Sequence, residues 1–312
     1  MYKNKKIAIS IPCYNEEKFI KKTIISLPKY IDTIYITDDS SKDNSKEIIL
    51  TLAKKDKRIN FVQNNKNTGN GYSVLRGLKQ ASKDNQDIVC VLAGDNQMDP
   101  KYLSLLLNEC INNNVDLAKG NRFEHLNELR KMPKARIIGN IIITLIAKIA
   151  TGYWSMADPL NGYTALKIKT FKNIDNIQIA LRYAYEASLL IQLSLVNAKI
   201  KDISIPAKYG TEKSDIKLIG DSFEIIATFT KGFFKRLLIK YILTSLNPIA
   251  LFYFCGIFLF LFGSFFGLYV AIDSIGPKSA TTATVMLSVI PFIIGVQFIL
   301  QAIILDIQAE PK

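Results

Sequence analysis

Residues 88–100, "IVCVLAGDNQMDP", join a short apolar run to a group of oxygen-bearing side chains. The apolar run, 88–92, has the length and the β-branched content of a buried strand. After a step of small residues come Asp95, Asn96, Gln97 and Asp99. This order predicts a strand that delivers carboxylate and amide oxygens to one edge of a sheet. Ala93 stands two residues before Asp95, where a second carboxylate would complete a pair.

These oxygens predict a metal site whose coordination shell is completed by a bound ligand. Asp99 precedes Pro100, and proline favours the first helical position, so Asp99 is expected to be an N-cap. Asp95 and Gln97 point the same way if the chain stays extended. Mg²⁺ needs only one or two carboxylates when substrate phosphates and water complete its octahedron. The pattern therefore favours a metal that binds together with a diphosphate over one held by protein alone.

The first 120 residues alternate between strand and helix patterns, which indicates a parallel α/β sheet. The expected strands are 7–11, 33–37, 60–62, 88–92 and 115–118, and the expected helices are 17–27, 44–54, 71–81 and 100–112. Four polar clusters fall at strand ends: "PCYNEE" from 12, "DDSSKDNS" from 38, "NNKNTGNGY" from 64 and "AGDNQMD" from 93. Ligands of open parallel sheets bind at the carboxyl ends of strands. The clusters therefore predict one ligand site.

The first two clusters allow both a structural and a binding interpretation. Tyr14 and Glu16 fit a base and a ribose, although Asn15 between them is also explained as a helix cap. Adjacent carboxylates point to opposite sides of an extended chain. We therefore expect one of Asp38 and Asp39 to bind a nucleotide and the other to fix the loop.

The third cluster contains glycines at a predicted helix start. Gly69 and Gly71 do not form a dinucleotide fingerprint, because Val74 occupies the third glycine position, and no P-loop is present. They still permit close backbone approach at a helix N-terminus, which favours phosphate. Arg76 is either a phosphate partner or a cation on a solvated helix face.

Composition narrows the remaining choices. The formal net charge is +13, the four cysteines are scattered, and the chain has a single histidine. The single histidine argues against a histidine-based metal site, and the wide spacing of the cysteines argues against a zinc knuckle. No nucleic-acid-binding motif accompanies the positive charge, so anionic lipid headgroups are the expected partner and nucleic acid is not.

Two charge-free runs, 249–272 and 279–305, exceed the roughly 20 residues that cross a bilayer as a helix. Lysines and an arginine before the first run predict that the large N-terminal part and both termini lie in the cytoplasm of a cell-membrane protein. The expected parts are an α/β domain at 1–220, interfacial amphipathic helices at 221–245, a transmembrane hairpin at 246–306 and a tail at 307–312. The segment 129–154 is either core or membrane surface, with the surface favoured.

With its four clusters in this order, the chain resembles the family 2 glycosyltransferases of A-type fold. Within them it is similar to the polyprenyl-phosphate glycosyltransferases, relatives of dolichol-phosphate mannose synthase. The resemblance implies a nucleotide-diphospho-sugar transferase domain with a mainly parallel sheet, then interfacial helices and two transmembrane helices. It implies inverting transfer of a sugar from a UDP- or GDP-linked donor to a polyprenyl or dolichyl phosphate at the cytoplasmic membrane face. It is also compatible with a homo-oligomer.

The resemblance assigns roles to particular residues. The nucleotide would be held by Pro12, Tyr14, Glu16 and Asp38 or Asp39. An Asp-x-Asp-x-Gln motif of the family corresponds to Ala93, Asp95 and Gln97, which implies Mg²⁺ or Mn²⁺ bound with the donor diphosphate. Because Ala93 removes one carboxylate, both the affinity for the metal and the choice of metal are open.

Later segments match the family as well. "KGNRF", from 119, makes Arg122 the expected ligand of the acceptor phosphate, and "DPLNGYTALK", from 158, carries an active-site Asp158 beside Asn161. "YEASLL" supplies Glu186. "IPAKYGTEKSDIK", from 205, resembles a lid over the donor, with Lys213 and Ser214 as phosphate ligands; Lys213 is alternatively a solvated loop charge.

Three alternatives differ in function. Processive polysaccharide synthases carry a Gln-x-x-Arg-Trp motif, which is absent here because the single tryptophan, Trp154, follows "ATGY". A non-catalytic nucleotide-sugar-binding scaffold at the membrane is favoured only by Ala93. A glycosyltransferase with a hydroxyl acceptor is the third alternative.

Overall fold

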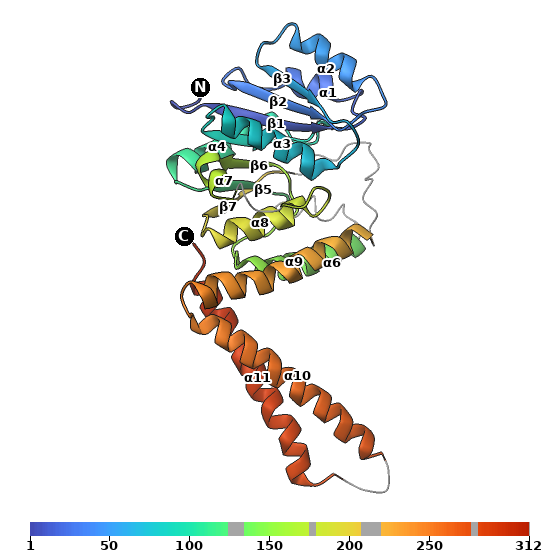
Figure 1. The fold of residues 1–312 in the computed structure, drawn as a ribbon, viewed down its shortest axis with the longest axis vertical. Coiled ribbons are helices and arrows are strands. Elements are labelled where there is room, and N and C mark those ends of the chain that lie inside the picture. Colours follow the sequence, from blue (N-terminus) through green and yellow to red (C-terminus); the bar gives the residue numbers. More distant parts are fainter. Residues whose placement is uncertain (124–133, 175–178, 207–219, 276–279, 312) are drawn as a thin grey trace. The chain divides into compact units, whose positions relative to one another are not determined.

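The computed structural model describes residues 1–123, 134–174, 179–206, 220–275 and 280–311 (Figure 1). The chain forms two compact units, Met1–Phe233 with Pro311–Lys312, and Phe234–Glu310. The first unit contains a seven-stranded sheet with helices around it, and the second consists mainly of two long helices.

The sheet has the order β3-β2-β1-β4-β6-β5-β7. Its strands are β1 (Ile7–Cys13), β2 (Thr33–Asp38), β3 (Ile59–Gln63), β4 (Ile88–Val91), β5 (Leu117–Asn121), β6 (Thr164–Lys167) and β7 (Ile200–Ser204). Strand β6 runs antiparallel to both of its neighbours, β4 and β5, while the other pairs are parallel. The prediction of a mainly parallel sheet is therefore confirmed.

The first helices alternate with these strands as the sequence predicts. They are α1 (Ile20–Ile25), α2 (Ser45–Ala53), α3 (Asn70–Lys83) and α4 (Leu103–Asn112), the last preceded by a 3₁₀ turn η1 (Pro100–Tyr102). Asp99 caps η1 by accepting a hydrogen bond from the backbone N–H of Lys101 at 3.0 Å, with Pro100 in the first turn. The expected N-cap role of Asp99 is confirmed.

The strand β1 shows how the two faces of the sheet are covered. Ile7, Ile9 and Ile11 are buried in one apolar cluster with residues of α1, α2 and α4. Ser10 points to the other face, where its hydroxyl lies 3.5 Å from the Val74 carbonyl of α3. Alternation along one strand thus places helices on both faces, and the carboxyl end of β1 lies between these layers.

Further helices of the first unit are α6 (Lys134–Thr151), α7 (Ile168–Ile174), α8 (Tyr185–Leu195) and α9 (Gly220–Arg236), the last ending just beyond this unit. On α6, Ala147 and Ala150 are buried, whereas Ile138, Ile141, Ile142 and Leu145 are exposed. An exposed apolar row on an otherwise packed helix indicates a surface for an apolar partner.

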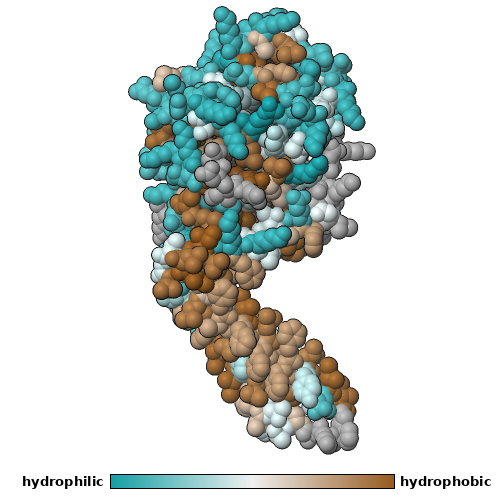
Figure 2. Space-filling view, viewed as in Figure 1, coloured by the Kyte–Doolittle hydropathy of each residue, from teal (hydrophilic) through white to brown (hydrophobic). Residues whose placement is uncertain are grey.

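The second unit contains a π-helical stretch η2 (Leu237–Leu243) and the helices α10 (Pro248–Asp273) and α11 (Thr282–Gln308). Both long helices are apolar and long enough to cross a membrane by length and composition, and apolar side chains cover them in Figure 2. They approach closely at glycines: a Cβ on Gly263 would lie 2.6 Å from the Phe292 nitrogen. Small residues at such contacts are typical of packed membrane helices.

Candidate active site

A cleft of about 290 Å³ opens at the carboxyl ends of β1 and β4, beside the start of α3. It is lined by Pro12, Cys13, Tyr14, Glu16, Asp39, Asn67, Gly69, Asn70, Ser73, Ala93, Gly94, Arg182 and Tyr183. All four predicted polar clusters contribute to this lining, the second through Asp39 and the fourth through Ala93 and Gly94. The structure therefore brings all four clusters to one site, as the parallel sheet requires.

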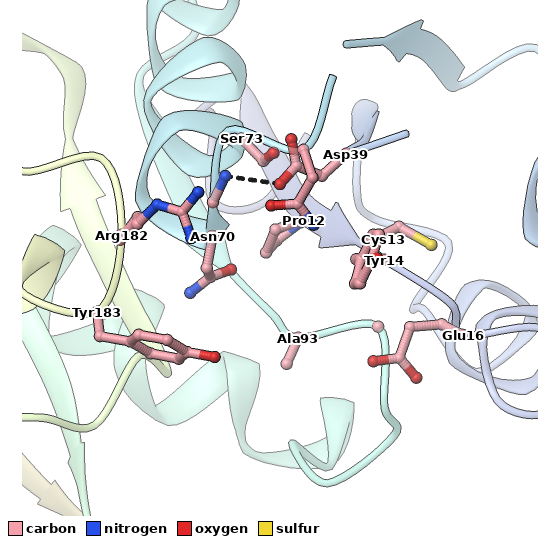
Figure 3. A pocket seen from close by; sticks show the side chains of 13 residues that line it. Pro12, Cys13, Tyr14, Glu16, Asp39, Asn70, Ser73, Ala93, Arg182 and Tyr183 are labelled. Atoms are coloured by element: carbon pink, nitrogen blue, oxygen red, sulfur yellow. Dashed lines mark hydrogen bonds between the residues drawn. The ribbon is translucent and has the colours of Figure 1, made fainter. Parts of the chain in front are cut away.

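The end of β1 supplies one wall of the cleft (Figure 3). Tyr14 is 39% exposed, so its ring is available to a ligand. Cys13 is buried, and burial, together with the charges of Asp38 and Glu16, raises the pKa of its thiol to about 12. Cys13 is therefore a neutral wall residue at physiological pH and not a nucleophile.

Asp38 and Asp39 are both buried and both anchor loops. Asp38 accepts hydrogen bonds from the Ser41 backbone N–H and hydroxyl. Asp39 accepts from the Asn64 amide at 2.7 Å, and from the backbone N–H groups of Thr68 at 2.9 Å and Gly69 at 2.7 Å. Of the two carboxylates, only Asp39 lines the cleft.

The start of α3 differs from the expected phosphate cradle. The Asp39 carboxylate already accepts the Gly69 N–H, so it takes a position near this helix end where an anion is favoured. Arg76 donates to the Gln63 carbonyl at 3.1 Å and to the Asn64 side-chain oxygen at 2.6 Å, and it is not among the residues lining the cleft.

The chain makes a tight turn at Asp95 and does not stay extended from Asp95 to Gln97. Asn96 has a φ of 59°, and the Gln97 backbone N–H donates to Asp95 Oδ1 at 2.9 Å. Asp and Asn favour such local turns, because their short side chains bond the backbone two residues on. Asp95 and Gln97 are therefore neighbours across a tight turn and not along a strand.

The oxygen atoms of this loop fit a metal ion whose remaining coordination positions are filled by a bound ligand and water. Among the described residues, no group of three or more His, Cys, Asp or Glu side chains could hold a metal ion. Asp95 offers one carboxylate beside Ala93 and Gly94, which line the cleft. A hard cation that takes its other oxygens from a diphosphate and water suits one carboxylate.

A second group of charges lies at the ends of β5 and β6. The Arg122 guanidinium binds the Asp158 carboxylate through two hydrogen bonds, Nε to Oδ2 at 2.7 Å and Nη2 to Oδ1 at 2.9 Å. Burial opposes ionisation of Asp158, but Arg122 outweighs it and holds the pKa of the carboxyl below its usual range. Asp158 is thus an anion that fixes the orientation of Arg122.

Two residues on neighbouring strands hold the loop that carries Asp158. Lys119 on β5 and Asp202 on β7 are paired in register. The buried Lys119 ammonium donates to the carbonyl oxygens of Asp158 and Asn161, and Asp202 Oδ2 accepts the Ala157 N–H at 2.7 Å. Asn161 closes the frame by donating to the Gly120 carbonyl at 2.7 Å.

The charge group and the Asp95 loop are neighbours. The Tyr163 hydroxyl donates to the Asp99 carbonyl at 2.9 Å, and the place of a Cβ on Gly162 is 3.6 Å from the Met98 methyl group and 3.3 Å from a Glu186 carboxylate oxygen. Burial raises the pKa of Glu186 to about 7. A carboxyl with a pKa near neutrality therefore lies beside the loop that carries Asp158.

Several residues of the site were not foreseen from the sequence. Arg182 and Tyr183 line the cleft, and Asp202 holds the Asp158 loop, but none of these three residues stands in a recognisable local motif. Lys119 opens the "KGNRF" segment, which indicated Arg122 and not the lysine. Lys213 and Ser214 fall in 207–219, outside the described residues.

The fold and the cleft fit a protein that binds its ligand at the carboxyl ends of parallel strands. A model of the family "Glycosyl transferase family 2" matches residues 8–186, more than half of the chain. The chain belongs to this family, and it is a glycosyltransferase of A-type fold.

Relatives and solved structures agree with this assignment. The chain is 29% identical over 219 residues to the UDP-N-acetylglucosamine–dolichyl-phosphate N-acetylglucosaminyltransferase of Methanococcus voltae, covering 66% of this chain and 87% of that one. It is 26% identical over 239 residues to the undecaprenyl-phosphate 4-deoxy-4-formamido-L-arabinose transferase of Pectobacterium atrosepticum, covering 72% and 68%. The glucosyl-3-phosphoglycerate synthase of Mycobacterium tuberculosis, solved with Mn²⁺ and UDP, shares the fold with a TM-score of 0.58 at 18% identity, over 73% and 80% of the chains.

Proposed function

We propose that this glycosyltransferase moves a sugar from a nucleoside-diphosphate donor, UDP- or GDP-linked, to a polyprenyl or dolichyl phosphate at a membrane face. The observation that carries the acceptor is a groove of about 360 Å³ lined mostly by apolar side chains, among them Ile141 and Leu145 of α6. Phe123 and Ala157 also line it, and they are the sequence neighbours of Arg122 and Asp158. A charged site for phosphate thus adjoins an apolar groove, which is the arrangement an amphiphilic acceptor needs.

The acceptor phosphate would be oriented by Arg122. Arginine binds phosphate oxygens through planar, charge-assisted hydrogen bonds. Asp158 holds the guanidinium in place, and Lys119 and Asp202 hold the Asp158 loop. A phosphate is already ionised near neutral pH, so its oxygen can attack the anomeric carbon without a strong general base.

The chemistry is then a single displacement. A new bond forms between a phosphate oxygen of the acceptor and the anomeric carbon, while the bond from that carbon to the donor diphosphate breaks. Direct displacement inverts the anomeric configuration. The chain contributes by positioning the two substrates, with Tyr14 and Glu16 at the nucleoside and Asp158 near the positive charge that develops on the sugar.

The metal belongs to the donor side in this proposal. Asp95 and Gln97 would hold Mg²⁺ or Mn²⁺ together with the donor diphosphate. The cation would neutralise charge on the departing nucleoside diphosphate. The single carboxylate predicts that the metal binds more weakly without a nucleotide than with one.

Attachment to the membrane follows from α10 and α11, which are apolar and long enough to span it. Lys231, Lys235, Arg236 and Lys240 precede α10. By the positive-inside rule this flank, the catalytic part and both termini would lie in the cytoplasm. Dividing the chain at 220, 245 and 306 is part of the same proposal.

The test uses full-length protein in lipid nanodiscs with Mg²⁺ or Mn²⁺, a polyprenyl phosphate and a panel of UDP- and GDP-sugars. Mass spectrometry reads out the lipid-linked sugar. One donor should give a product, and Asp95→Ala should abolish it, whereas the remote, exposed Glu47→Gln should keep it. Donor binding without product from any donor would instead support a non-catalytic nucleotide-sugar scaffold.

Glu186 favours a second candidate function. A carboxyl with a pKa of about 7 suits a general base, which a hydroxyl acceptor requires and a phosphate acceptor does not. Replacing the polyprenyl phosphate by an alcohol acceptor in the same assay separates the two reactions.

A further inference from the structure

Arg182 is the only cationic side chain among the described residues that line the nucleotide cleft. It is exposed, and its guanidinium makes no hydrogen bond or ion pair with another residue in the described part of the chain. The carboxylates of Glu16 and Asp39 line the same cleft. A ligand that brings further negative charge therefore needs a cation on the protein side.

The position of Arg182 is set by tight backbone packing. Residues 179–184 lie against the start of α3, where the Tyr72 backbone N–H donates to the Leu181 carbonyl at 2.8 Å. A Cβ on Gly69 would lie 2.7 Å from both the Leu181 oxygen and Arg182 Cγ, and one on Gly71 would lie 2.6 Å from the Ala180 oxygen. Only glycine allows this approach, and Gly69 also has a φ of 111°.

The two glycines therefore have a different consequence from the one their sequence suggests. They let the segment 179–184 pack directly on α3, so that Arg182 enters the cleft beside Asn70. Figure 3 shows Arg182 and Tyr183 on the wall opposite Tyr14 and Glu16, with Ala93 between the walls. A ligand spanning the cleft would meet Tyr14 on one side and Arg182 on the other.

The other arginines near the site are already engaged. Arg122 binds the Asp158 carboxylate in a two-point contact, and Arg76 donates to the loop at 63–64. Arg182 has no such partner in the described residues. Its five N–H donors remain available for the oxygens of a ligand.

We propose that Arg182 binds a phosphate of the nucleoside diphosphate, through a seat that Gly69 and Gly71 create for its segment. This rests on the proposed function, because it assumes that the cleft holds the donor nucleotide. Ala93 stands where a second carboxylate would help to hold the metal ion. Because the metal is held by fewer carboxylates, the positive charge of Arg182 becomes more important for binding the diphosphate. Arg182 acts as a donor-binding residue and makes no contact with the acceptor phosphate.

The experiment compares full-length wild type, Arg182→Gln, Arg182→Lys and Lys79→Gln in detergent micelles. Lys79 is an exposed cation on α3 that does not line the cleft, so it controls for loss of one charge. Binding of UDP and GDP is measured by calorimetry with Mn²⁺ and with EDTA. Binding of uridine and guanosine is measured by ligand-observed NMR.

We expect Arg182→Gln to raise the Kd of the preferred nucleoside diphosphate about 10- to 100-fold. The Kd of the matching nucleoside should stay within about two-fold, Arg182→Lys should recover part of the loss, and Lys79→Gln should behave as wild type. An unchanged diphosphate Kd in both buffers, or equal losses for nucleoside and diphosphate, would overturn the assignment. A wild type that binds neither UDP nor GDP would overturn the proposed function along with it.

Discussion

The surroundings of Asp158 and Glu186 shift the pKa values of their carboxyl groups in opposite directions. Arg122 keeps the pKa of Asp158 below its usual range, whereas burial raises the pKa of Glu186 to about 7. The difference comes from the partner and not from the residue type, because both side chains are sheltered from water. Asp158 can therefore serve as a permanent anion while Glu186 titrates near neutral pH.

The pKa of Glu186 predicts a pH-dependent stability. Its folded pKa of about 7 exceeds the ordinary value of 4.5, so the folded chain binds this proton more tightly than the unfolded chain. The resulting stabilisation is complete below pH 4.5 and is lost as the pH rises through 7. The Tm of Glu186→Gln minus the Tm of the wild type should therefore be about 4 °C larger at pH 8 than at pH 5.

Differential scanning fluorimetry of the full-length protein at both pH values measures this gain. Glu47→Gln is the control, because Glu47 is exposed on α2 and does not line the cleft. A difference between Glu186→Gln and wild type that is the same at pH 5 and pH 8 would contradict the assignment.

Local sequence predicts residues whose partners are close in the chain. The cap formed by Asp99 depends only on Pro100 and Lys101, so it was predictable. Arg182 enters the cleft because the segment 179–184, far from α3 in sequence, packs on Gly69 and Gly71. Such a contact leaves no mark in a window of neighbouring residues, and the same holds for Asp202.

At the scale of elements, the paired strands β5 and β7 form the support of the Asp158 loop. Lys119 binds carbonyl oxygens of that loop, and Asp202, its partner in register, accepts a backbone N–H from it. Because the two charges also face each other within the frame, they support one another electrostatically. The loop is thus held from both strands.

Removing the Asp202 carboxylate should loosen this frame. Asp202→Ala leaves the part-buried Ala157 N–H without this acceptor, at a cost of about 1 kcal/mol. We expect a lower Tm and a lower kcat, while the Kd for the donor nucleotide stays close to the wild-type value. Asp202→Asn, which keeps one acceptor oxygen, should retain more of both properties, and an increased donor Kd with unchanged kcat would contradict the account.

The exposed apolar face of α6 is expected to contact the isoprenoid chain of the acceptor. Leu145 lines the apolar groove and is 54% exposed, so Leu145→Gln should weaken contact with a long isoprenoid chain. The KM for a long polyprenyl phosphate should rise about three- to ten-fold, with little change for a short analogue. Leu105→Gln, on an exposed position of α4, is the control; equal effects on both acceptors would remove α6 from the acceptor site.

The order of the elements was predictable where helices and strands alternate. The boundaries of β1 to β4 follow from apolar runs that end in polar clusters, and the structure places these strands within a few residues of the expected ranges. Strands β6 and β7 were not predicted, because the strand and helix patterns that alternate up to residue 120 become less regular after it. Their pairing with β4 and β5 is decided by contacts far apart in sequence.

In the whole molecule, the α/β unit contains the candidate active site and the second unit contains the two long apolar helices. Within the second unit, Arg236 and Asp306 are completely buried and form a two-point ion pair, with Nη1–Oδ1 at 2.7 Å and Nη2–Oδ2 at 2.9 Å. The Tyr241 hydroxyl also donates to Asp306 at 2.6 Å. These contacts join the stretch before α10 to the end of α11.

Breaking this pair on one side should destabilise the helix pair strongly. Asp306→Ala leaves a buried guanidinium without its anion, which costs about 3 kcal/mol or more. We expect a lower Tm in micelles and faster proteolysis of the second unit. The double variant Arg236→Met with Asp306→Leu should be closer to wild type, since it removes both charges; a double variant as unstable as the single one would contradict this view.

A matched pair of acceptors distinguishes a phosphate acceptor from an alcohol acceptor. Full-length protein in nanodiscs, with its preferred nucleotide sugar and Mn²⁺, is offered a polyprenyl phosphate or the polyprenol of the same chain length. The products are measured by mass spectrometry. We expect a sugar phosphodiester from the polyprenyl phosphate and no product from the polyprenol. A glycoside formed from the polyprenol, with the phosphate left unmodified, would contradict it.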